Sequence, residues 1–123
     1  IPLRPLRVLV VDDEPLVGAA VARLLGDRHD ITVIVEAEAA IARLTDGPPV
    51  DVVLCDLMMP GTSGIELFSV IEHDPELARR FVFVTGGSGT PIAASFLARV
   101  TNPVVEKPFD AAALTAAIAA VAG

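Results

Sequence analysis

The sequence predicts an α/β fold in which helices cover both faces of a parallel sheet, and three observations support this. Five short apolar runs alternate with five segments of helical period along the 123 residues. The connections between them are short, which favours parallel strands joined by right-handed crossovers. The composition is 53% hydrophobic but only 4% aromatic. A core of Val, Leu, Ile and Ala suits a helix-flanked sheet better than a small β-sandwich.

The expected strands are short apolar runs bounded by polar or turn residues. They are 7–11 (RVLVV), 31–35 (ITVIV), 51–55 (DVVLC), 81–85 (FVFVT) and 103–106 (PVVE). Four of them are rich in β-branched residues and show no polar alternation. This pattern is typical of strands that are covered on both faces.

The expected helices lie between and after these strands. They are 16–25, 37–44, 64–72, 91–100 and 111–121. Thr90 before Pro91 is a typical helix start, and Asp110 is placed as the N-cap of the last helix. The alternation predicts a three-layer α/β/α sandwich around a flavodoxin-like, doubly wound (βα)5 sheet of strand order 2-1-3-4-5. We expect one domain over 1–123, with 1–5 as a linker remnant.

Composition also limits the partners of this chain. A net charge of -7, with nine scattered basic residues, argues against direct binding of nucleic acid. No apolar run reaches the roughly 18 residues that a membrane span needs, so we expect no membrane contact by this domain. Cys55 is the only cysteine, which excludes an internal disulfide and fits a reducing compartment. We therefore expect a cytoplasmic location.

Polar side chains follow four of the expected strands. Asp12 and Asp13 come after the first strand, Asp56 after the third, Thr85 ends the fourth and Lys107 follows the fifth. Ligands of doubly wound sheets bind beyond the carboxyl ends of the strands. Three carboxylates, a hydroxyl and an ammonium group are therefore expected to converge on one rim.

The chemistry of this cluster points to phosphoryl transfer. Two carboxylates about 4 Å apart repel each other by roughly 4 kcal/mol at an effective dielectric near 20. A Mg²⁺ ion held by Asp12, Asp13 and Asp56 would offset this repulsion. Asp56 could then accept a phosphoryl group as an aspartyl-phosphate, while Lys107 and Thr85 stabilise its oxygens.

Four segments together resemble the signature segments of the response-regulator receiver domain of two-component signalling. They are VLVVDDEP, VVLCDLMMPGTSGIEL, FVFVTGG and VVEKPF, each at the end of an expected strand. The resemblance runs from about Leu6 to Val121. An acidic pair or a Lys-Pro-Phe alone is weak evidence, whereas all four segments in this order are specific.

The resemblance implies a role for each residue of the acidic cluster. Asp56 would be the phosphoacceptor, and a phosphohistidine on a histidine kinase or a histidine phosphotransfer domain would be the donor. Asp13 would bind Mg²⁺ directly and Asp12 mainly through water. The backbone carbonyl of Met58 would be a further metal ligand.

The resemblance also implies a switch and shows one departure. Thr85 would turn toward the attached phosphoryl group, Lys107 would pair with it, and the bond from Lys107 to Pro108 would be cis. Many receivers carry a switch aromatic three positions before the lysine, but this chain has Val104 there. Output is then expected to run through the glycine-rich loop 86–91.

The surface and parent protein of such a domain are also expectations. Phosphorylation would repack the face formed by 91–100, 103–106 and 111–121, through which the domain could form a homodimer. The pattern TGG…TP…FLARV…NPVVEKPF resembles receivers fused to the C-terminus of hybrid sensor histidine kinases. A stand-alone response regulator and the receiver half of a transcription factor are the alternatives.

Two other classes of protein share part of this pattern. A Mg²⁺-dependent phosphohydrolase of the haloacid-dehalogenase kind also uses Asp, Thr and Lys, but it needs a second Asp where this chain has Met58. A degenerate receiver that only binds partners would not need all five chemical positions. The resemblance implies a domain that catalyses its own phosphorylation but acts as a regulator more than as a turnover enzyme.

Overall fold

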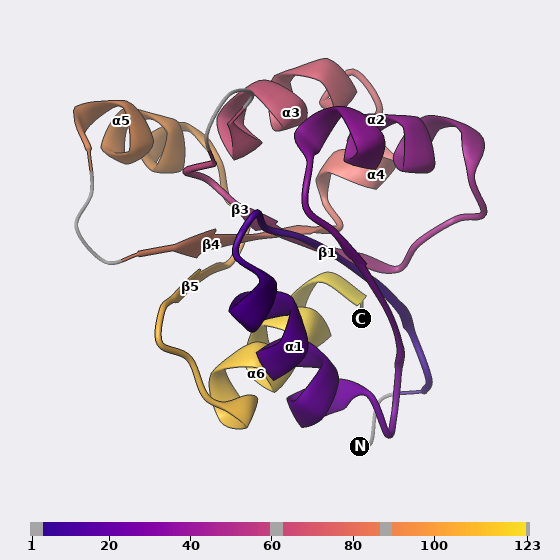
Figure 1. Ribbon diagram of the computed structural model, residues 1–123. Helices are drawn as coiled ribbons and strands as arrows, with labels where there is room; N and C mark the ends of the chain where they lie inside the picture. Colours follow the sequence, from indigo (N-terminus) through magenta and orange to yellow (C-terminus); the bar gives the residue numbers. More distant parts are fainter. Residues whose placement is uncertain (1–3, 60–62, 87–89, 123) are drawn as a thin grey trace.

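The computed structural model describes residues 4–59, 63–86 and 90–122, and its strands form one parallel sheet (Figure 1). The strands are β1 Arg7–Val11, β2 Asp30–Ile34, β3 Val52–Asp56, β4 Phe81–Thr85 and β5 Val104–Glu106. Their order is β2-β1-β3-β4-β5, with all pairs parallel, as the sequence predicts. The expected strand positions are correct to within one residue at either end.

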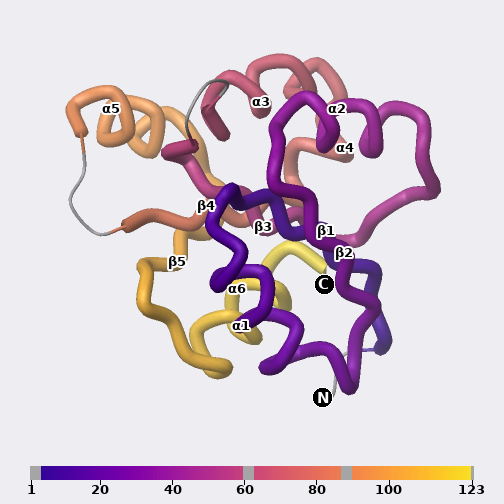
Figure 2. Tube along the Cα trace, in the orientation of Figure 1, coloured from indigo at the N-terminus to yellow at the C-terminus, as the bar shows by residue number. Residues whose placement is uncertain are grey.

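Helices cover both faces of the sheet and make the three layers (Figure 1). They are α1 Pro15–Leu25, α2 Ala37–Asp46, α3 Gly64–Ile71, α4 Pro75–Ala78, α5 Pro91–Arg99 and α6 Ala111–Ala122. Helices α2 to α5 lie on one face, and α1 and α6 on the other, as the chain trace in Figure 2 also shows. The prediction of a three-layer sandwich is confirmed.

Local signals fix where the helices begin. The Ala93 amide donates to the Thr90 hydroxyl at 3.1 Å, and the Ala113 amide donates to Asp110 Oδ1 at 2.8 Å, so both predicted caps form. The single turn α4 was not expected. It begins at Pro75 after the cap Asp74, but four residues are too few to show a helical period.

The central strands separate two apolar layers. On β4, Phe81 and Phe83 pack into the layer under α2, α3 and α5, whereas Val82 and Val84 pack into the layer with α1 and α6. This is the alternation of side chains along a strand. Both layers are apolar, so β1, β3 and β4 are buried nearly throughout.

The expectation that four strands are covered on both faces is wrong for β2. This strand is half-exposed along its length, and Val33 keeps 40% of its surface accessible. The physical reason is its place at the edge of the sheet, where it pairs with β1 alone. β5, at the other edge, is also exposed at Val104 and Glu106.

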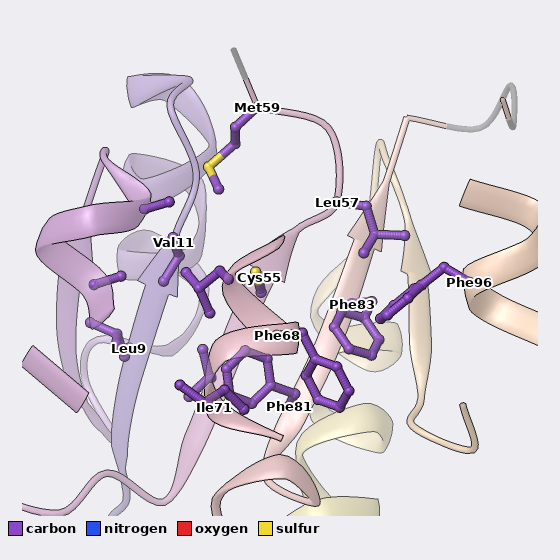
Figure 3. Packing of buried hydrophobic residues seen from close by; sticks show 14 of the residues in the cluster. Leu9, Val11, Cys55, Leu57, Met59, Phe68, Ile71, Phe81, Phe83 and Phe96 are labelled. Atoms are coloured by element: carbon purple, nitrogen blue, oxygen red, sulfur yellow. The ribbon is translucent and has the colours of Figure 1, made fainter. Parts of the chain in front are cut away.

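Four of the five phenylalanines form one cluster that joins α3, β4 and α5 (Figure 3). The Phe68 ring meets those of Phe81, Phe83 and Phe96 edge-on, with centroids 5.2–5.6 Å apart. Phe83 and Phe96 are 5.0 Å apart. Such edge contacts add about 1 kcal/mol each to the burial of the rings.

None of the helices in the described ranges is long and apolar enough to cross a membrane.

Gly64, the first residue of α3, packs directly against the backbone at the end of β3. Its amide donates to the Leu57 carbonyl at 3.2 Å. A Cβ at this position would collide with the carbonyl oxygen of Asp56 and lie 3.0 Å from Cys55 Sγ. The first helical residue of α3 must therefore be glycine for β3 and α3 to approach this closely.

We predict that Gly64→Ala lowers the free energy of unfolding by about 2 kcal/mol, because backbone and buried sulfur cannot give way cheaply. Chemical denaturation measures the change. Gly86→Ala is the matched control, since a Cβ there meets no described atom within 4 Å. Equal stability of the two variants would contradict the close approach seen at Gly64.

Candidate functional site

The predicted site residues lie at the carboxyl ends of β1, β3, β4 and β5. Val11 pairs with Cys55, so Asp12 and Asp56 follow at the same rim. Asp56 pairs with Val84, which places Thr85 one residue further along the neighbouring strand. The Lys107 amide donates to the Thr85 carbonyl at 2.8 Å, just after β5. The strand register thus brings the predicted residues together.

Three carboxylates meet at this rim. One oxygen from each of Asp12, Asp13 and Asp56 lies within 4.8 Å of the others. Asp12 is 1% exposed and Asp56 4% exposed, while Asp13 faces solvent. Two of the three negative charges are therefore largely removed from water.

Backbone amides orient the two buried carboxylates. Asp12 Oδ1 accepts a hydrogen bond from the Glu14 amide at 2.9 Å, and Asp56 Oδ1 accepts one from the Met58 amide at 3.1 Å. In each case the donor is two residues further along the chain, as in an Asx turn. The second oxygen of each carboxylate faces the shared space.

Lys107, the only lysine of the chain, points its ammonium group toward that space. Its Nζ lies 3.0 Å from Asp12 Oδ2, 3.4 Å from Asp56 Oδ2 and 3.6 Å from Glu14 Oε2. The bond from Lys107 to Pro108 is cis, as the resemblance implies. One ammonium group therefore offsets much of the repulsion between the buried carboxylates.

The pKa values at the site reflect burial and this crowding. Burial raises the pKa of Asp56, and the nearby Asp12 charge adds to the rise, against the opposing effects of the Met58 amide and Lys107. Burial alone would lower the pKa of Lys107, but contact with Asp12 and the charge of Asp56 raise it on balance. The surroundings of Asp56 therefore disfavour its charged form on balance.

The donor set fits a hard divalent cation. Asp12 Oδ2 is buried and accepts no hydrogen bond from the described residues; its one close contact is the ion pair with Lys107. Carboxylate oxygens at this spacing are ligands that Mg²⁺ accepts together with water and phosphate oxygens. The cluster could therefore hold a metal ion.

Glu14 also reaches this rim, although the sequence analysis assigns it no role. Its carboxylate reaches the lysine from the first residues after β1. The position of Glu14 directly after Asp12 and Asp13 indicates that it lies near the site. The direction of its exposed side chain cannot be predicted from the sequence.

Thr85 and Val104 belong to the expected switch. Thr85 is half-buried at the end of β4. Val104 pairs with Phe83 and is 44% exposed, so no aromatic side chain stands at that position of β5. Residues 87–89 of the loop 86–91, through which we expected output to run, lie outside the described residues.

The other reactive side chains have structural surroundings. Cys55 is fully buried, and burial raises the pKa of its thiol. Met59 is 7% exposed and packs in the core. His29 Nδ1 accepts from the Leu6 amide, and His73 Nδ1 lies 2.8 Å from the Val70 carbonyl, so neither ring approaches the acidic cluster.

Comparisons with known proteins agree with this arrangement. The family model of the response regulator receiver domain matches residues 8–119. The chain is 32% identical over 115 residues to the DNA-binding response regulator MtrA of Mycolicibacterium smegmatis, covering 93% of this chain and 49% of MtrA. It is 35% identical over 121 residues to the transcriptional regulatory protein FixJ of Azorhizobium caulinodans, covering 96% and 56%.

A solved structure supports the fold. The Francisella response regulator 1452 receiver domain superposes with a TM-score of 0.77 over 95% of this chain and 96% of that one, at 20% identity. The chain belongs to the family of response regulator receiver domains. It spans about half the length of the curated relatives MtrA and FixJ.

We predict that Asp56→Asn stabilises the metal-free protein at neutral pH. A carboxyl whose folded pKa is raised binds its proton more tightly when folded, so stability falls as pH rises past the unfolded value near 3.8 and through the folded value. Asp56→Asn has no such carboxyl group and so does not lose this stability. The difference in stability between the variant and wild type should therefore shrink below about pH 4. Thermal unfolding of both proteins in EDTA, from below pH 4 to neutral pH, measures this difference. A difference that stays constant over that range would show that the raised pKa of Asp56 is not its cause.

Proposed function

We propose that this domain takes a phosphoryl group from a phosphohistidine onto Asp56 in a Mg²⁺-dependent reaction and changes conformation to regulate signalling. The donor is a histidine kinase or a histidine phosphotransfer domain. The observation that carries the proposal is the Asp56 carboxylate, held beside Asp12 and Asp13 with Lys107 Nζ at 3.4 Å. Family membership supports it, since receiver domains are phosphorylated by histidine kinases.

The transfer is a displacement at phosphorus. An oxygen of the Asp56 carboxylate forms the new P–O bond while the P–N bond of the donor breaks, and the imidazole nitrogen leaves with the electron pair and takes up a proton. Asp56 needs no base, because it is already ionised in the reactive form. The Met58 amide on Oδ1 fixes the plane of the carboxylate for this attack.

The site must also accept the negative charge of the phosphoryl group. A Mg²⁺ ion held by Asp12, Asp13, Asp56 and the Met58 carbonyl would neutralise part of that charge. Lys107 pairs with a phosphoryl oxygen, and the Thr85 hydroxyl donates to another. If these two contacts favour the active arrangement by about 3 kcal/mol, the population ratio changes roughly a hundredfold.

Output is proposed to use the face of α5, β5 and α6. Ile92 is 71% exposed at the start of α5 and Val104 is 44% exposed on β5, so apolar surface is available there for a homodimer or another partner. Because Val104 stands where many receivers have the switch aromatic, no aromatic ring on β5 can carry the conformational change to this face. Other residues must carry it.

Two kinds of parent protein are proposed for this domain. The C-terminal receiver of a hybrid sensor histidine kinase is the context that the sequence pattern favours. The matched relatives MtrA and FixJ are named as regulators of transcription or DNA-binding proteins, which favours the alternative of a receiver half of such a regulator. We place the domain in the cytoplasm in either case, and the reading frame on both sides of the chain decides between them.

A phosphohydrolase is less well supported. Its second acidic residue would stand at Met58, whose side chain is 51% exposed and carries no proton donor. The family match points to the receiver instead.

We predict that acetyl phosphate with Mg²⁺ adds one phosphoryl group to the wild-type domain and that Asp56→Asn abolishes the gain, because an amide cannot act as this nucleophile. Intact-protein mass spectrometry measures it. Asp27→Asn, an exposed aspartate between α1 and β2, is the matched control and should keep the gain. Phosphate on the Asp56→Asn variant would refute the assignment, and none on wild type would favour a module that only binds partners.

We predict that Lys107→Ala still accepts phosphate, at least tenfold more slowly, but fails to change conformation, because the ammonium no longer joins the phosphoryl group to β5. Amide NMR shifts at Thr85 and along α5, recorded with beryllofluoride and Mg²⁺, measure the change. Shifts as large as those of wild type would remove Lys107 from the switch.

A further inference from the structure

Glu14 occupies a capping position but does not cap. It precedes α1 with extended backbone angles, and its side chain makes no hydrogen bond to the first amides of the helix. The side chains that usually accept such a bond are the shorter ones of Ser, Thr, Asp and Asn. The Oε2 atom of Glu14 lies 3.6 Å from Lys107 Nζ instead.

The three partners of Lys107 differ in their access to water. The side chains of Asp12 and Asp56 are 2% and 6% exposed, whereas that of Glu14 is 60% exposed. Glu14 therefore approaches the ammonium from the solvent side. The buried carboxylates hold it from within.

The proposed reaction must rearrange these contacts. A phosphoryl group on Asp56 must arrive from the solvent side, because β3 is buried and is paired with β1 and β4 along both of its edges. Lys107 must then pair with a phosphoryl oxygen. The carboxylate of Glu14 competes for the same ammonium.

We propose that Glu14 is a positioning residue that holds Lys107 in its resting place and so restrains phosphoryl binding at Asp56. This inference rests on the proposed function. Glu14 acts through Lys107 and need not touch the phosphoryl group. Removing the Glu14 carboxylate should make it easier for Lys107 to move from Asp12 and Asp56 to a phosphoryl oxygen.

Glu36 provides a matched control. It follows β2 at the same rim, precedes α2 with extended backbone angles and likewise makes no side-chain cap. No ion pair joins it to Lys107 in the described part of the chain. A change that depends on charge alone should appear in both variants.

The test compares Glu14→Gln with Glu36→Gln. Beryllofluoride affinity and the rate of uptake from acetyl phosphate are measured at saturating Mg²⁺, so that a change in metal affinity does not enter. The salt concentration is 0.5 M, where the screening length is roughly 4 Å and the distant field of an exposed carboxylate is small. Because the chain has one lysine, its side-chain NMR signal reports the contact directly.

We expect Glu14→Gln to bind beryllofluoride and take up phosphate about fivefold better and to shift the lysine signal in the resting domain. Glu36→Gln should change none of these. In a Lys107→Ala background, the gain from Glu14→Gln should shrink to less than half, because no ammonium remains to be released.

Two results overturn the inference while leaving the proposed function intact: a Glu14→Gln domain that behaves as wild type, and a gain as large without Lys107 as with it. A wild-type domain that neither binds beryllofluoride nor takes up phosphate overturns the proposed function itself.

Discussion

The crowding of the Asp12 and Asp56 carboxylates around one ammonium group is the interaction on which the rest of this site depends. Removing a carboxylate from water costs several kcal/mol even after the surroundings relax. Here two are nearly buried side by side, and Lys107 at 3.0 and 3.4 Å is what compensates them in the metal-free domain. The fold must therefore hold a lysine against its acidic rim. That lysine comes from the strand at the far edge of the sheet, two strands away from Asp56.

This arrangement makes the balance of charge at the rim depend on Asp56. Among the described residues, the buried Asp12 Oδ2 is compensated only by its ion pair with Lys107, and burial raises the pKa of Asp56. A cation or an altered charge on Asp56 changes this balance directly. The layers on both sides of β3 are apolar, so the charges of the site are concentrated at the rim.

Most of the fold, and the placement of the candidate site residues at one rim, could be predicted from the sequence because the signals are local. Buried strands such as β3 show as β-branched runs, and a parallel sheet places whatever follows its strands at one rim. The exposure of β2 could not be predicted, since an apolar run looks the same at an edge as in the centre. The contacts of Lys107 with Asp12 and Glu14 depend on side-chain directions, which no spacing encodes. The turn α4 is shorter than any periodic pattern.

The phenylalanine cluster has a practical consequence. The chain contains no tryptophan or tyrosine, so it lacks the fluorescence that usually reports on folding. Phe83 lies two residues before Thr85 on β4 and touches Phe96 of α5 at 5.0 Å between centroids. Each ring of this pair shifts the NMR signals of the other through its ring current. The aromatic proton spectrum therefore reports the distance between β4 and α5, and few other aromatic signals overlap with it.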